Sequence, residues 1–480
     1  MSILVVDIGT SGVRSAIVRP DATIAVEHRQ EVLPDTPAPG LIEFDATRMA
    51  TAALSTAKAA LADGGTVAAV GIANQRASTI VWDRSTGEPV APGLGWQDLR
   101  TLGDCLVFQT EGLRFAPNQS ATKIKHLLDA ADPDRRRDLC VGTVDSWIIW
   151  TLTEGAVNVT DASNAAVTGL FSIDTLDWDD ALLARLNISR SAMPTIVDSS
   201  GPIAPATAID GAPMMCGIAG DQQASLIGQG CVHPGPAKIT FGTGGMLDLV
   251  VGPNRPTSAM RSASGTFPIV AWKRGEETMW GVEAIMLSAG TNVEWLRDDL
   301  GIIDSVAASH DIAQQCEDTD GVVYVPALLG LGTPQWDYGA RGTLLGITRG
   351  TARPHIVRAV LEGVAQRGAD LVDAAEASTG LAIPTLRVDG GMSANATFTQ
   401  ALANATQRTV EISPVLEATT LGAAFLAGLS AGTWGNWDDI AATWRPIRTV
   451  EPSGDAHRER WASAIERARG WHGDLSAFDF

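Results

Sequence analysis

Apolar strands that end in polar turns set the pattern of this chain. A run of four apolar residues, Ile3 to Val6, leads to Asp7, and the turn Gly9-Thr-Ser-Gly12 follows before a second apolar run. This alternation predicts a strand, a tight turn and another strand. The glycines let the backbone fold closely around a ligand, and the hydroxyl and N–H groups at the tip suit an anion such as phosphate. A plain hairpin with a polar tip is the competing interpretation.

The same pattern returns in the second half of the chain. Residues 237–251 again predict a strand, a Gly-Thr-Gly turn at 242–244 and a second strand. Two phosphate-type turns, one near the start of each half, indicate a duplicated architecture with a nucleotide held between the halves. The repeat therefore favours anion binding over the plain hairpin.

Between these turns the pattern predicts alternating strands and helices. Asp45 is expected to cap a helix over 50–61, and residues 67–73 predict a buried strand that ends at Asn74-Gln-Arg76. Because polar residues at the carboxyl end of a strand often face the ligand crevice of an α/β sheet, Arg76 is a candidate binding residue. A long helix is expected over 280–300. Residues 418–437 carry no charge, but Thr, Gly, Ser and Asn interrupt them, which favours a buried helix over a membrane span.

The length of the chain favours two α/β domains. At 480 residues it exceeds the size at which one hydrophobic core stops growing. Helix and strand breakers concentrate just after residue 228. We therefore expect one domain over 1–228, a hinge over 229–237 and a second domain over 238–480.

Charge and cysteine content narrow the classes of partner. The formal net charge of −20 disfavours nucleic acid and anionic membrane surfaces as partners. Five cysteines, odd in number and widely spaced, argue against a disulfide framework and against a Cys-x-x-Cys metal site. The chain enters a strand at once, which leaves no room for a signal peptide. These features predict a cytoplasmic protein.

Several motifs together resemble a known family. The segments Asp7-Ile-Gly-Thr-Ser-Gly12 and Thr240-Phe-Gly-Thr-Gly244 resemble the two phosphate loops of the actin-like ATPase superfamily. Gly217-Ile-Ala-Gly-Asp-Gln-Gln-Ala224 and the segment from Gly346 through Glu362 are similar to the FGGY carbohydrate kinases, closest to the glycerol kinase branch, and the similarity runs over nearly the whole chain. The resemblance implies two actin-like (ribonuclease H-like) domains with a nucleotide and substrate cleft between them.

The resemblance also implies ATP and Mg²⁺ as cofactors. Asp7 would hold the metal, since a hard cation prefers carboxylate and phosphate oxygens. One departure is Glu294, where glycerol kinases tend to carry Gln, so that a donor toward the nucleoside is lost. The residues implied for the phosphates are Thr10, Ser11, Gly12, Arg14, Gly242, Thr243 and Gly244, and those for the adenosine are Gly290, Glu294, Gly391 and Asn395.

Asp221 is the expected general base for phosphoryl transfer. It follows the apolar run Ile218-Ala-Gly220, which predicts a carboxylate at a strand end beside Gln222. An N-cap of the following helix is the alternative role, and the complete motif favours the base. With Arg76 and Gln222, Trp96 is implied in the substrate site as an aromatic wall.

Three positions that match the glycerol pocket of the family differ together. Ala77 stands where a glycerol-binding Glu is expected, Asn118 where a Tyr is expected and Met246 where a Phe closes the pocket. Each change removes bulk or a polar contact. The expected acceptor is therefore a primary hydroxyl of a four- or five-carbon polyol, with a pentulose as the alternative.

Other phosphate chemistries fit less well. A Walker A loop is excluded because none of the lysines, at 58, 123, 125, 238 and 273, follows a glycine, and the protein-kinase motifs are absent. A filament or chaperone ATPase of the same superfamily, or a phosphatase acting on polyphosphate, would share only the phosphate loops. The predicted partner is a small polyol or sugar, and a homodimer is left open.

Overall fold

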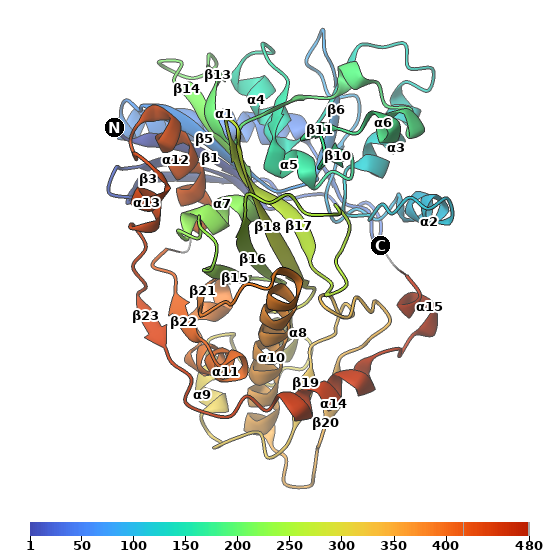
Figure 1. The fold of residues 1–480 in the computed structure, drawn as a ribbon, viewed down its shortest axis with the longest axis vertical. Coiled ribbons are helices and arrows are strands. Elements are labelled where there is room, and N and C mark those ends of the chain that lie inside the picture. Colours follow the sequence, from blue (N-terminus) through green and yellow to red (C-terminus); the bar gives the residue numbers. More distant parts are fainter. Residues whose placement is uncertain (416, 479–480) are drawn as a thin grey trace.

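Two large sheets, one in each half of the chain, organise the computed structural model, which describes residues 1–415 and 417–478 (Figure 1). In the first sheet, the apolar run of β1 lies at the centre and is fully buried, because helices cover both faces. The central strands β1, β5 and β14 are parallel, and β1 to β3 form an antiparallel meander. The strands run in the order β3 (Ile24–Glu31), β2 (Gly12–Val18), β1 (Ile3–Ile8), β5 (Ala69–Asn74), β14 (Met214–Gly220) and β13 (Ser200–Pro205).

The second sheet repeats the plan of the first. Its three central strands are again parallel, an antiparallel meander lies on one side of them and a single antiparallel strand on the other. The order is β17 (Phe267–Arg274), β18 (Glu277–Met286), β16 (Gly245–Gly252), β15 (Ala237–Phe241), β21 (Thr385–Asp389), β22 (Thr409–Ile412) and β23 (Arg448–Val450). Apart from the extra edge strand β17, the order matches, so the predicted duplication is confirmed.

Helices from both ends of the chain cover the first sheet. Helices α1 (Ala46–Gly64) and α4 (Val144–Leu152) pack on one face, and α7 (Asp221–Gly228) and α12 (Ala418–Ala431) on the other. The predicted cap of α1 is confirmed, since the Asp45 side chain accepts a bond from the Arg48 backbone N–H. Helix α12 comes from the second half of the sequence, yet a Cβ at Gly71 of β5 would lie 2.2 Å from the Ala423 carbonyl oxygen.

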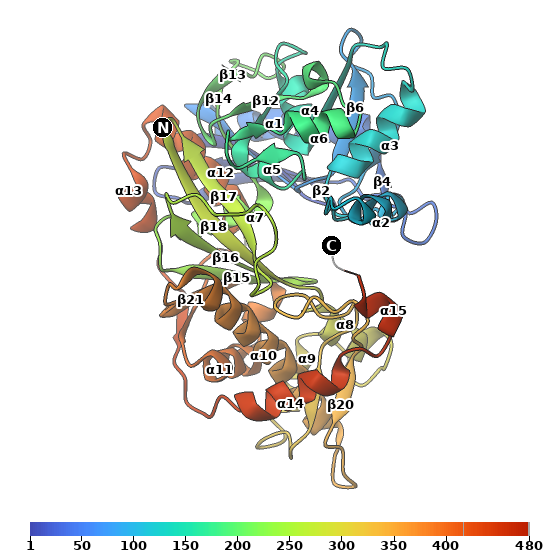
Figure 2. The ribbon, with the colours of Figure 1, turned by 45° about the vertical axis from the view of Figure 1, so that its right-hand side comes forward.

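Helices α7 and α12 cross in direct backbone contact. A Cβ at Gly228 would lie 1.8 Å from the Ala418 carbonyl oxygen, and a Cβ at Gly422 would lie 1.8 Å from the Ala224 carbonyl oxygen. Only glycine fits at either position. Figure 2 shows α7 at the level where the two domains meet. This crossing therefore joins the two halves of the molecule beside the residues that follow β14.

The long helix predicted over 280–300 is wrong. Strand β18 runs to Met286, and the short helix α8 (Thr291–Asp298) begins after a turn. The apolar run Trp280 to Met286 is compatible with either structure by itself. The strand forms because β16 and β17 supply hydrogen-bond partners on both of its edges. The prediction of a buried helix in 418–437 is confirmed by α12, which is followed by the separate short helix α13 (Trp437–Ala441).

The remaining elements extend each domain. The first has a four-stranded sheet in the order β4 (Glu43–Phe44), β7 (Gly93–Leu94), β6 (Thr79–Asp83) and β8 (Leu139–Thr143). It also has two strand pairs, β9 (Val159–Asp161) with β12 (Thr195–Val197) and β10 (Phe171–Ser172) with β11 (Asp177–Trp178). Its further helices are α2 (Leu102–Thr110), α3 (Ala121–Ala131), α5 (Ala162–Ala166), α6 (Asp180–Arg185) and the 3₁₀ helix η1 (Arg190–Ala192). In the second are α9 (Ala308–Ala313), β19 (Val323–Val325), β20 (Thr343–Leu345), α10 (Arg353–Thr379), η2 (Gly391–Ala394), α11 (Ala396–Thr406), α14 (Arg458–Ala468) and α15 (Gly473–Ser476).

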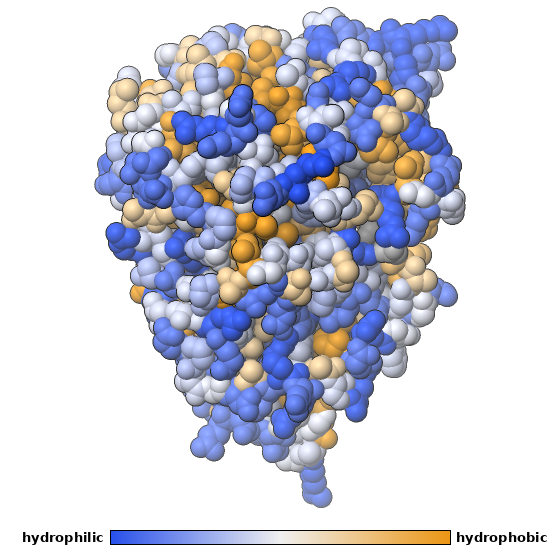
Figure 3. Space-filling model, viewed as in Figure 1, coloured by the Kyte–Doolittle hydropathy of each residue, from blue (hydrophilic) through white to orange (hydrophobic). Residues whose placement is uncertain are grey.

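Hydrophilic residues cover most of the face in Figure 3, and hydrophobic ones gather mainly in its upper half. Within the described residues, none of the helices combines the length and the apolar character that crossing a bilayer requires.

Candidate active site

The first phosphate-type turn is a tight connection between β1 and β2. The Gly9 N–H donates to the Gly12 carbonyl at 2.9 Å, which closes the turn, and Ser11 at its tip is exposed. A Cβ at Gly12 would lie 2.7 Å from the Gln30 carbonyl of β3, so the adjoining strand also requires glycine here. Thr10, Ser11 and Gly12 thus stand at the edge of the sheet where the parallel strands end.

Asp7 lies at the end of β1 with its carboxylate largely enclosed. Its Oδ2 accepts a bond from the Thr420 hydroxyl of α12 at 3.2 Å. Burial raises the pKa of Asp7 to about 6, the nearby charge of Arg14 opposes this, and the like charge of Asp221 adds to it. A carboxylate in this setting is stabilised by any cation that enters beside it.

Asp221 and Arg76 meet where two neighbouring strands end. Asn74 of β5 and Gly220 of β14 are register partners in the sheet, so the residues that follow them emerge side by side. Arg76 Nε lies 3.4 Å from Asp221 Oδ1, and the Asp221 side chain is 34% exposed, which leaves it accessible to a substrate. Burial raises the pKa of Asp221, while the charges of Arg76 and Lys238 act in the opposite direction. An accessible carboxylate and a raised pKa are both properties that a general base requires.

Arg76 is held by a buried carboxylate from the other domain. Its Nη2 lies 2.6 Å from Glu283 Oε2 of β18, and its Nη1 donates to Gln223 Oε1 at 3.4 Å. Burial alone would lower the pKa of Arg76, but Glu283 and Asp221 outweigh it and raise that pKa. Burial raises the pKa of Glu283 to about 7 against the opposing charge of Arg76. The pair fixes the guanidinium across the interface between the domains.

Lys238 connects α7 to the second sheet. Its Nζ donates to Gln222 Oε1 at 2.6 Å and lies 2.7 Å from Asp248 Oδ2, and both charged side chains are fully buried. Sequence reasoning missed Lys238, Asp248 and Glu283. Lys238 and Asp248 are each the only charge in a mostly apolar strand, and Glu283 is the only charge in the interior of β18. A buried charge requires a partner. That pattern could have identified all three.

Trp96, predicted as an aromatic wall, lies against the first phosphate-type turn. Its indole N–H donates to the Thr10 hydroxyl at 3.3 Å, and its backbone N–H donates to the Ser78 hydroxyl at 3.0 Å. The Lys123 ammonium, buried behind it, donates to the Trp96 carbonyl at 3.0 Å, and burial lowers the pKa of Lys123 to about 7. The predicted aromatic residue is therefore joined directly to the first phosphate-type turn.

The three positions predicted to alter the glycerol pocket differ in their setting. Ala77 is buried next to Arg76 in the left-handed region, with φ of 60°, and its carbonyl accepts a bond from Ser120 Oγ at 2.9 Å. Met246 is half-buried on β16, opposite Ile285 of β18. Asn118 is exposed on the loop before α3, and within the described residues no hydrogen bond joins it to another predicted site residue.

The second phosphate-type turn packs against the predicted adenosine region. The Gly290 N–H donates to the Gly242 carbonyl at 2.8 Å, and the Ala289 N–H donates to the Thr243 carbonyl at 2.8 Å. These bonds bring the start of α8 onto residues 242–244. A Cβ at Gly244 would lie 2.8 Å from the Met286 carbonyl, whereas a Cβ at Gly242 would meet nothing within 4 Å, so the face of the turn at Gly242 is open.

Other predicted nucleotide residues lie around this turn with different partners. A Cβ at Gly391 would meet no atom within 4 Å, so the space beside it is open. Asn395 caps α11, because its side chain accepts a bond from the Phe398 N–H. Glu294 is exposed on α8. Arg14, predicted to face the phosphates, forms ion pairs with Glu417 and with Glu27, the latter at 3.5 Å.

The donor set suits a magnesium ion only together with a nucleotide. Within the described part of the chain there is no group of three or more His, Cys, Asp or Glu side chains able to hold a metal ion. Mg²⁺ commonly binds through one or two carboxylates, water and substrate phosphates. The single buried carboxylate of Asp7 beside the turn fits that mode.

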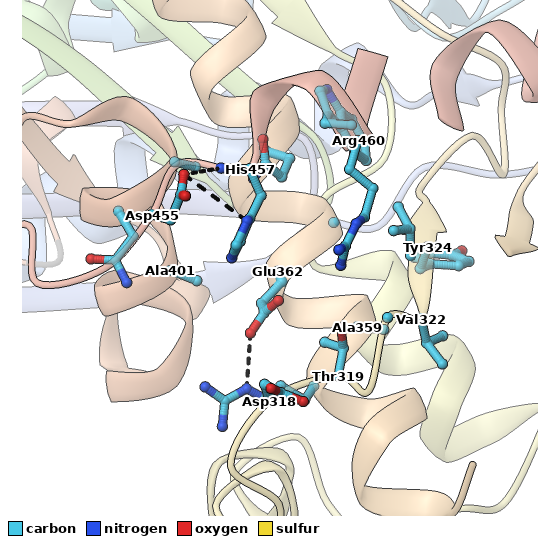
Figure 4. A pocket seen from close by; sticks show the side chains of 18 of the residues that line it. Asp318, Thr319, Val322, Tyr324, Ala359, Glu362, Ala401, Asp455, His457 and Arg460 are labelled. Carbon is cyan, nitrogen blue, oxygen red and sulfur yellow. Dashed lines mark hydrogen bonds and ion pairs between the residues drawn. The ribbon is translucent and has the colours of Figure 1, made fainter. Parts of the chain in front are cut away.

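A cavity of about 330 Å³ lies apart from these residues, among α10, α11 and α14 in the second domain (Figure 4). Its charged groups largely pair with one another: Arg358 Nε lies 2.8 Å from Glu362 Oε1, and His457 Nδ1 lies 4.0 Å from Asp455 Oδ1. None of the residues predicted for the active site lines it. We assign it no role in the chemistry.

Comparison with known proteins finds the same family in both halves of the chain. Models of the FGGY family of carbohydrate kinases match residues 2–228 with their N-terminal domain and residues 237–431 with their C-terminal domain. A glycerol kinase of Aromatoleum aromaticum is 40% identical over 494 residues, which cover 98% of this chain and 99% of the relative.

Two solved structures share the arrangement of both domains. The crystal structure of Plasmodium falciparum glycerol kinase with ADP has a TM-score of 0.91 at 29% identity and covers 97% of this chain and 98% of that one. A ligand-bound xylulose kinase from Lactobacillus acidophilus has a TM-score of 0.86 at 20% identity and covers 99% of this chain and 98% of that one, which is a likeness of fold. The predicted two-domain fold with actin-like topology is confirmed.

Proposed function

Because the chain belongs to the FGGY family of carbohydrate kinases, we propose that it transfers the γ-phosphoryl group of ATP to a primary hydroxyl of a small polyol. The observation that carries the proposal is the placement of Asp221, which is accessible, 3.4 Å from Arg76 and at the same sheet edge as the first phosphate-type turn. Phosphoryl transfer needs a positioned hydroxyl, a proton acceptor and donors around the phosphates.

Each part of the site then has a role. Asp221 accepts the proton of the attacking hydroxyl, and Arg76 with Gln222 orients the acceptor. The N–H and hydroxyl groups of residues 10–12 and of residues 242–244 hold the phosphates from the two domains. Asp7 would hold Mg²⁺, which supplies neutralisation of phosphate charge when bound.

The acceptor is proposed to be larger than glycerol. What supports this is the small side chain at Ala77 and the flexible side chain at Met246. Asn118, where a Tyr is expected, is exposed on the loop before α3 and adds less support. Without a carboxylate to pair one of its hydroxyls, glycerol should lose part of its advantage over other polyols. Smaller side chains at these positions would leave space for a four- or five-carbon polyol. The names of the relatives favour glycerol itself, since the Aromatoleum protein is a glycerol kinase. A pentulose has no comparable support, because the xylulose kinase likeness is one of fold.

A coupled ADP-release assay over glycerol, erythritol, threitol, the pentitols and the pentuloses decides among these acceptors. We expect the highest kcat/KM for a four- or five-carbon polyol. A clear maximum for glycerol would overturn the assignment of a larger acceptor and leave the kinase proposal intact. ATP hydrolysis that none of these compounds accelerates would instead support a non-kinase ATPase of the same superfamily.

Restoring the three family residues provides a second test of acceptor size. The combined substitution Ala77→Glu, Asn118→Tyr and Met246→Phe is expected to raise kcat/KM for glycerol and lower it for the larger polyol. The change in the ratio should reach about 100-fold, because a paired hydroxyl contributes several kcal/mol to discrimination. An unchanged ratio in a folded variant would contradict the importance of these positions.

The proposed compartment remains the cytoplasm. All five cysteines are free thiols, and four of them are buried, as expected for a protein kept in a reducing environment.

A further inference from the structure

A short polar segment, residues 161–164, lies directly behind the active site. It consists of the last residue of β9 and the first three of α5, and Asp161, Ser163 and Asn164 are all fully buried. The Asp161 carboxylate is saturated with donors, since it accepts from the backbone N–H groups of Ser163 and Asn164, from both of their side chains and from the Ser199 hydroxyl at 2.6 Å. The segment is therefore a rigid block of hydrogen bonds rather than a loose loop.

Ser163 connects this block to the strand that carries the base. Its Oγ accepts the backbone N–H of Gly220 at 3.0 Å while donating to Asp161 Oδ1 at 2.9 Å. Gly220 is the last residue of β14 and immediately precedes Asp221. The Ser163 hydroxyl thus fixes the backbone at Gly220, one residue before Asp221.

Asn164 connects the same block to the strand that carries Arg76. Its amide and the amide of Asn74 form a reciprocal pair, with Asn74 Nδ2 to Asn164 Oδ1 at 2.9 Å and Asn164 Nδ2 to Asn74 Oδ1 at 3.0 Å. Asn74 is the last residue of β5, two residues before Arg76, and it is fully buried. Both strand ends of the site are therefore anchored to two consecutive side chains.

We propose that Ser163 and Asn164 are positioning residues for phosphoryl transfer: Ser163 sets the place of Asp221, and Asn164 sets the place of Arg76. The inference rests on the proposed function, since Asp221 and Arg76 are assigned as base and acceptor ligand there. A displacement of about 1 Å in a reacting group can cost on the order of 100-fold in rate. Neither side chain needs to touch the substrate.

The two residues should affect different kinetic constants. Ser163→Ala is expected to lower kcat about 10- to 100-fold with the acceptor KM nearly unchanged, because it loosens the base. Asn164→Ala is expected to raise the acceptor KM about 10-fold with a smaller effect on kcat, because it loosens the arginine that holds the acceptor. Ser163→Thr keeps the hydroxyl and should recover most of the lost turnover.

A matched control separates positioning from lost stability. Ser15 is also fully buried and bonds the Thr56 hydroxyl at 2.8 Å, but it faces α1 rather than the site. Ser15→Ala removes one buried hydrogen bond where Ser163→Ala removes two. We therefore expect a measurable but smaller loss of stability in urea unfolding, with kcat and KM unchanged. Equal kinetic losses in Ser15→Ala and Ser163→Ala would overturn the proposal.

A double-mutant cycle provides the second decisive readout. If Ser163 acts through the base, Ser163→Ala should cost little further turnover in an Asp221→Asn background. Fully additive losses would show that Ser163 acts elsewhere and would reject the inference. The wild-type acceptor screen tests the proposed function separately. If wild type only hydrolyses ATP, that function fails, and the same variants compared by ATP hydrolysis still test whether Ser163 positions Asp221.

Discussion

At the scale of single residues, buried charges in pairs define the site. Arg76 with Glu283 and Lys238 with Asp248 lie 2.6 and 2.7 Å apart. Removing one member of such a pair leaves an uncompensated buried charge, which is strongly destabilising. Asp221 differs because its partner Arg76 is shared and its own side chain is accessible. It is therefore the carboxylate that is free to accept a proton without dismantling the network.

Replacing the proposed base tests that distinction. Asp221→Asn removes the proton acceptor while keeping the size of the side chain. We expect kcat to fall by about 10²- to 10⁴-fold, with ATP affinity nearly unchanged because the phosphate turns are intact. Steady-state turnover and calorimetric binding of ATP would measure the two quantities. Near-normal turnover would contradict the assignment of Asp221.

The buried carboxylate of Asp145 predicts that the stability of the fold depends on pH. Asp145, in the first turn of α4, accepts bonds from the hydroxyls of Thr143 and Thr160, and burial raises its pKa from 3.8 to about 6. The folded protein therefore binds more protons than the unfolded chain between these values. Its stability should fall as pH rises through that window, and the loss should be complete above about pH 6.

Asp145→Asn cannot titrate and should lose this dependence. Between pH 4 and 6, the free energy of unfolding of wild type should fall relative to the variant by up to about 1.4 kcal/mol per pH unit, as urea unfolding at several pH values would show. Asp304→Asn is the control, since Asp304 is exposed. A constant difference between Asp145→Asn and wild type would be evidence against a raised pKa.

At the scale of elements, two helices and their glycines join the domains. Helix α7 starts at Asp221, the proposed general base, and α12 packs across α7 on the face of the first sheet. Lys238 to Gln222 and Gln229 to Asp389, at 2.6 and 2.7 Å, attach α7 to the second sheet as well. The helix that bears Asp221 is thus bonded to both domains.

A methyl group at the helix crossing should be severely destabilising. In Gly422→Ala the new Cβ would meet the Ala224 carbonyl at 1.8 Å, a backbone atom that cannot rotate away. We expect a loss of about 3 kcal/mol or more in urea unfolding. Gly103→Ala in α2 is the matched control, because a Cβ there meets nothing within 4 Å and a helical glycine gains from replacement by alanine. Equal effects of the two substitutions would contradict the close crossing.

At the scale of the whole molecule, the two phosphate-type turns lie in different domains, and in the proposed function both hold the same triphosphate. We infer that the domains close over ATP and acceptor about the connection after residue 228, which also excludes water that would compete for the phosphoryl group. The cross-domain pair of Arg76 and Glu283 shows that acceptor-side residues already span the interface.

Small-angle scattering should detect this closure. The radius of gyration is expected to decrease when a non-hydrolysable ATP analogue and the best polyol are both bound, and to decrease less with the analogue alone. Calorimetry in the same buffer would confirm occupancy. A radius of gyration that does not change in the occupied ternary complex would rule out closure as the way in which the two turns converge.

The sequence by itself determined the features in which chemistry and local structure coincide. Asp7 and the turn from Gly9 to Gly12 are adjacent in the chain, as are Gly220 and Asp221, so a strand and its following polar residues were readable together. Repetition of the strand-turn-strand pattern was enough to predict the duplicated fold, because the same short motif produces the same local geometry in each half.

Only the tertiary structure decided the features that depend on distant partners. Residues 280–286 become a strand because β16 and β17 offer hydrogen bonds on both sides, and α12 covers the first sheet although it lies at the far end of the chain. Glu283 reaches Arg76 across 207 residues, and Asn164 reaches Asn74 across 90. Side-chain pairing at such separations is set by packing of whole elements, which local propensity does not encode.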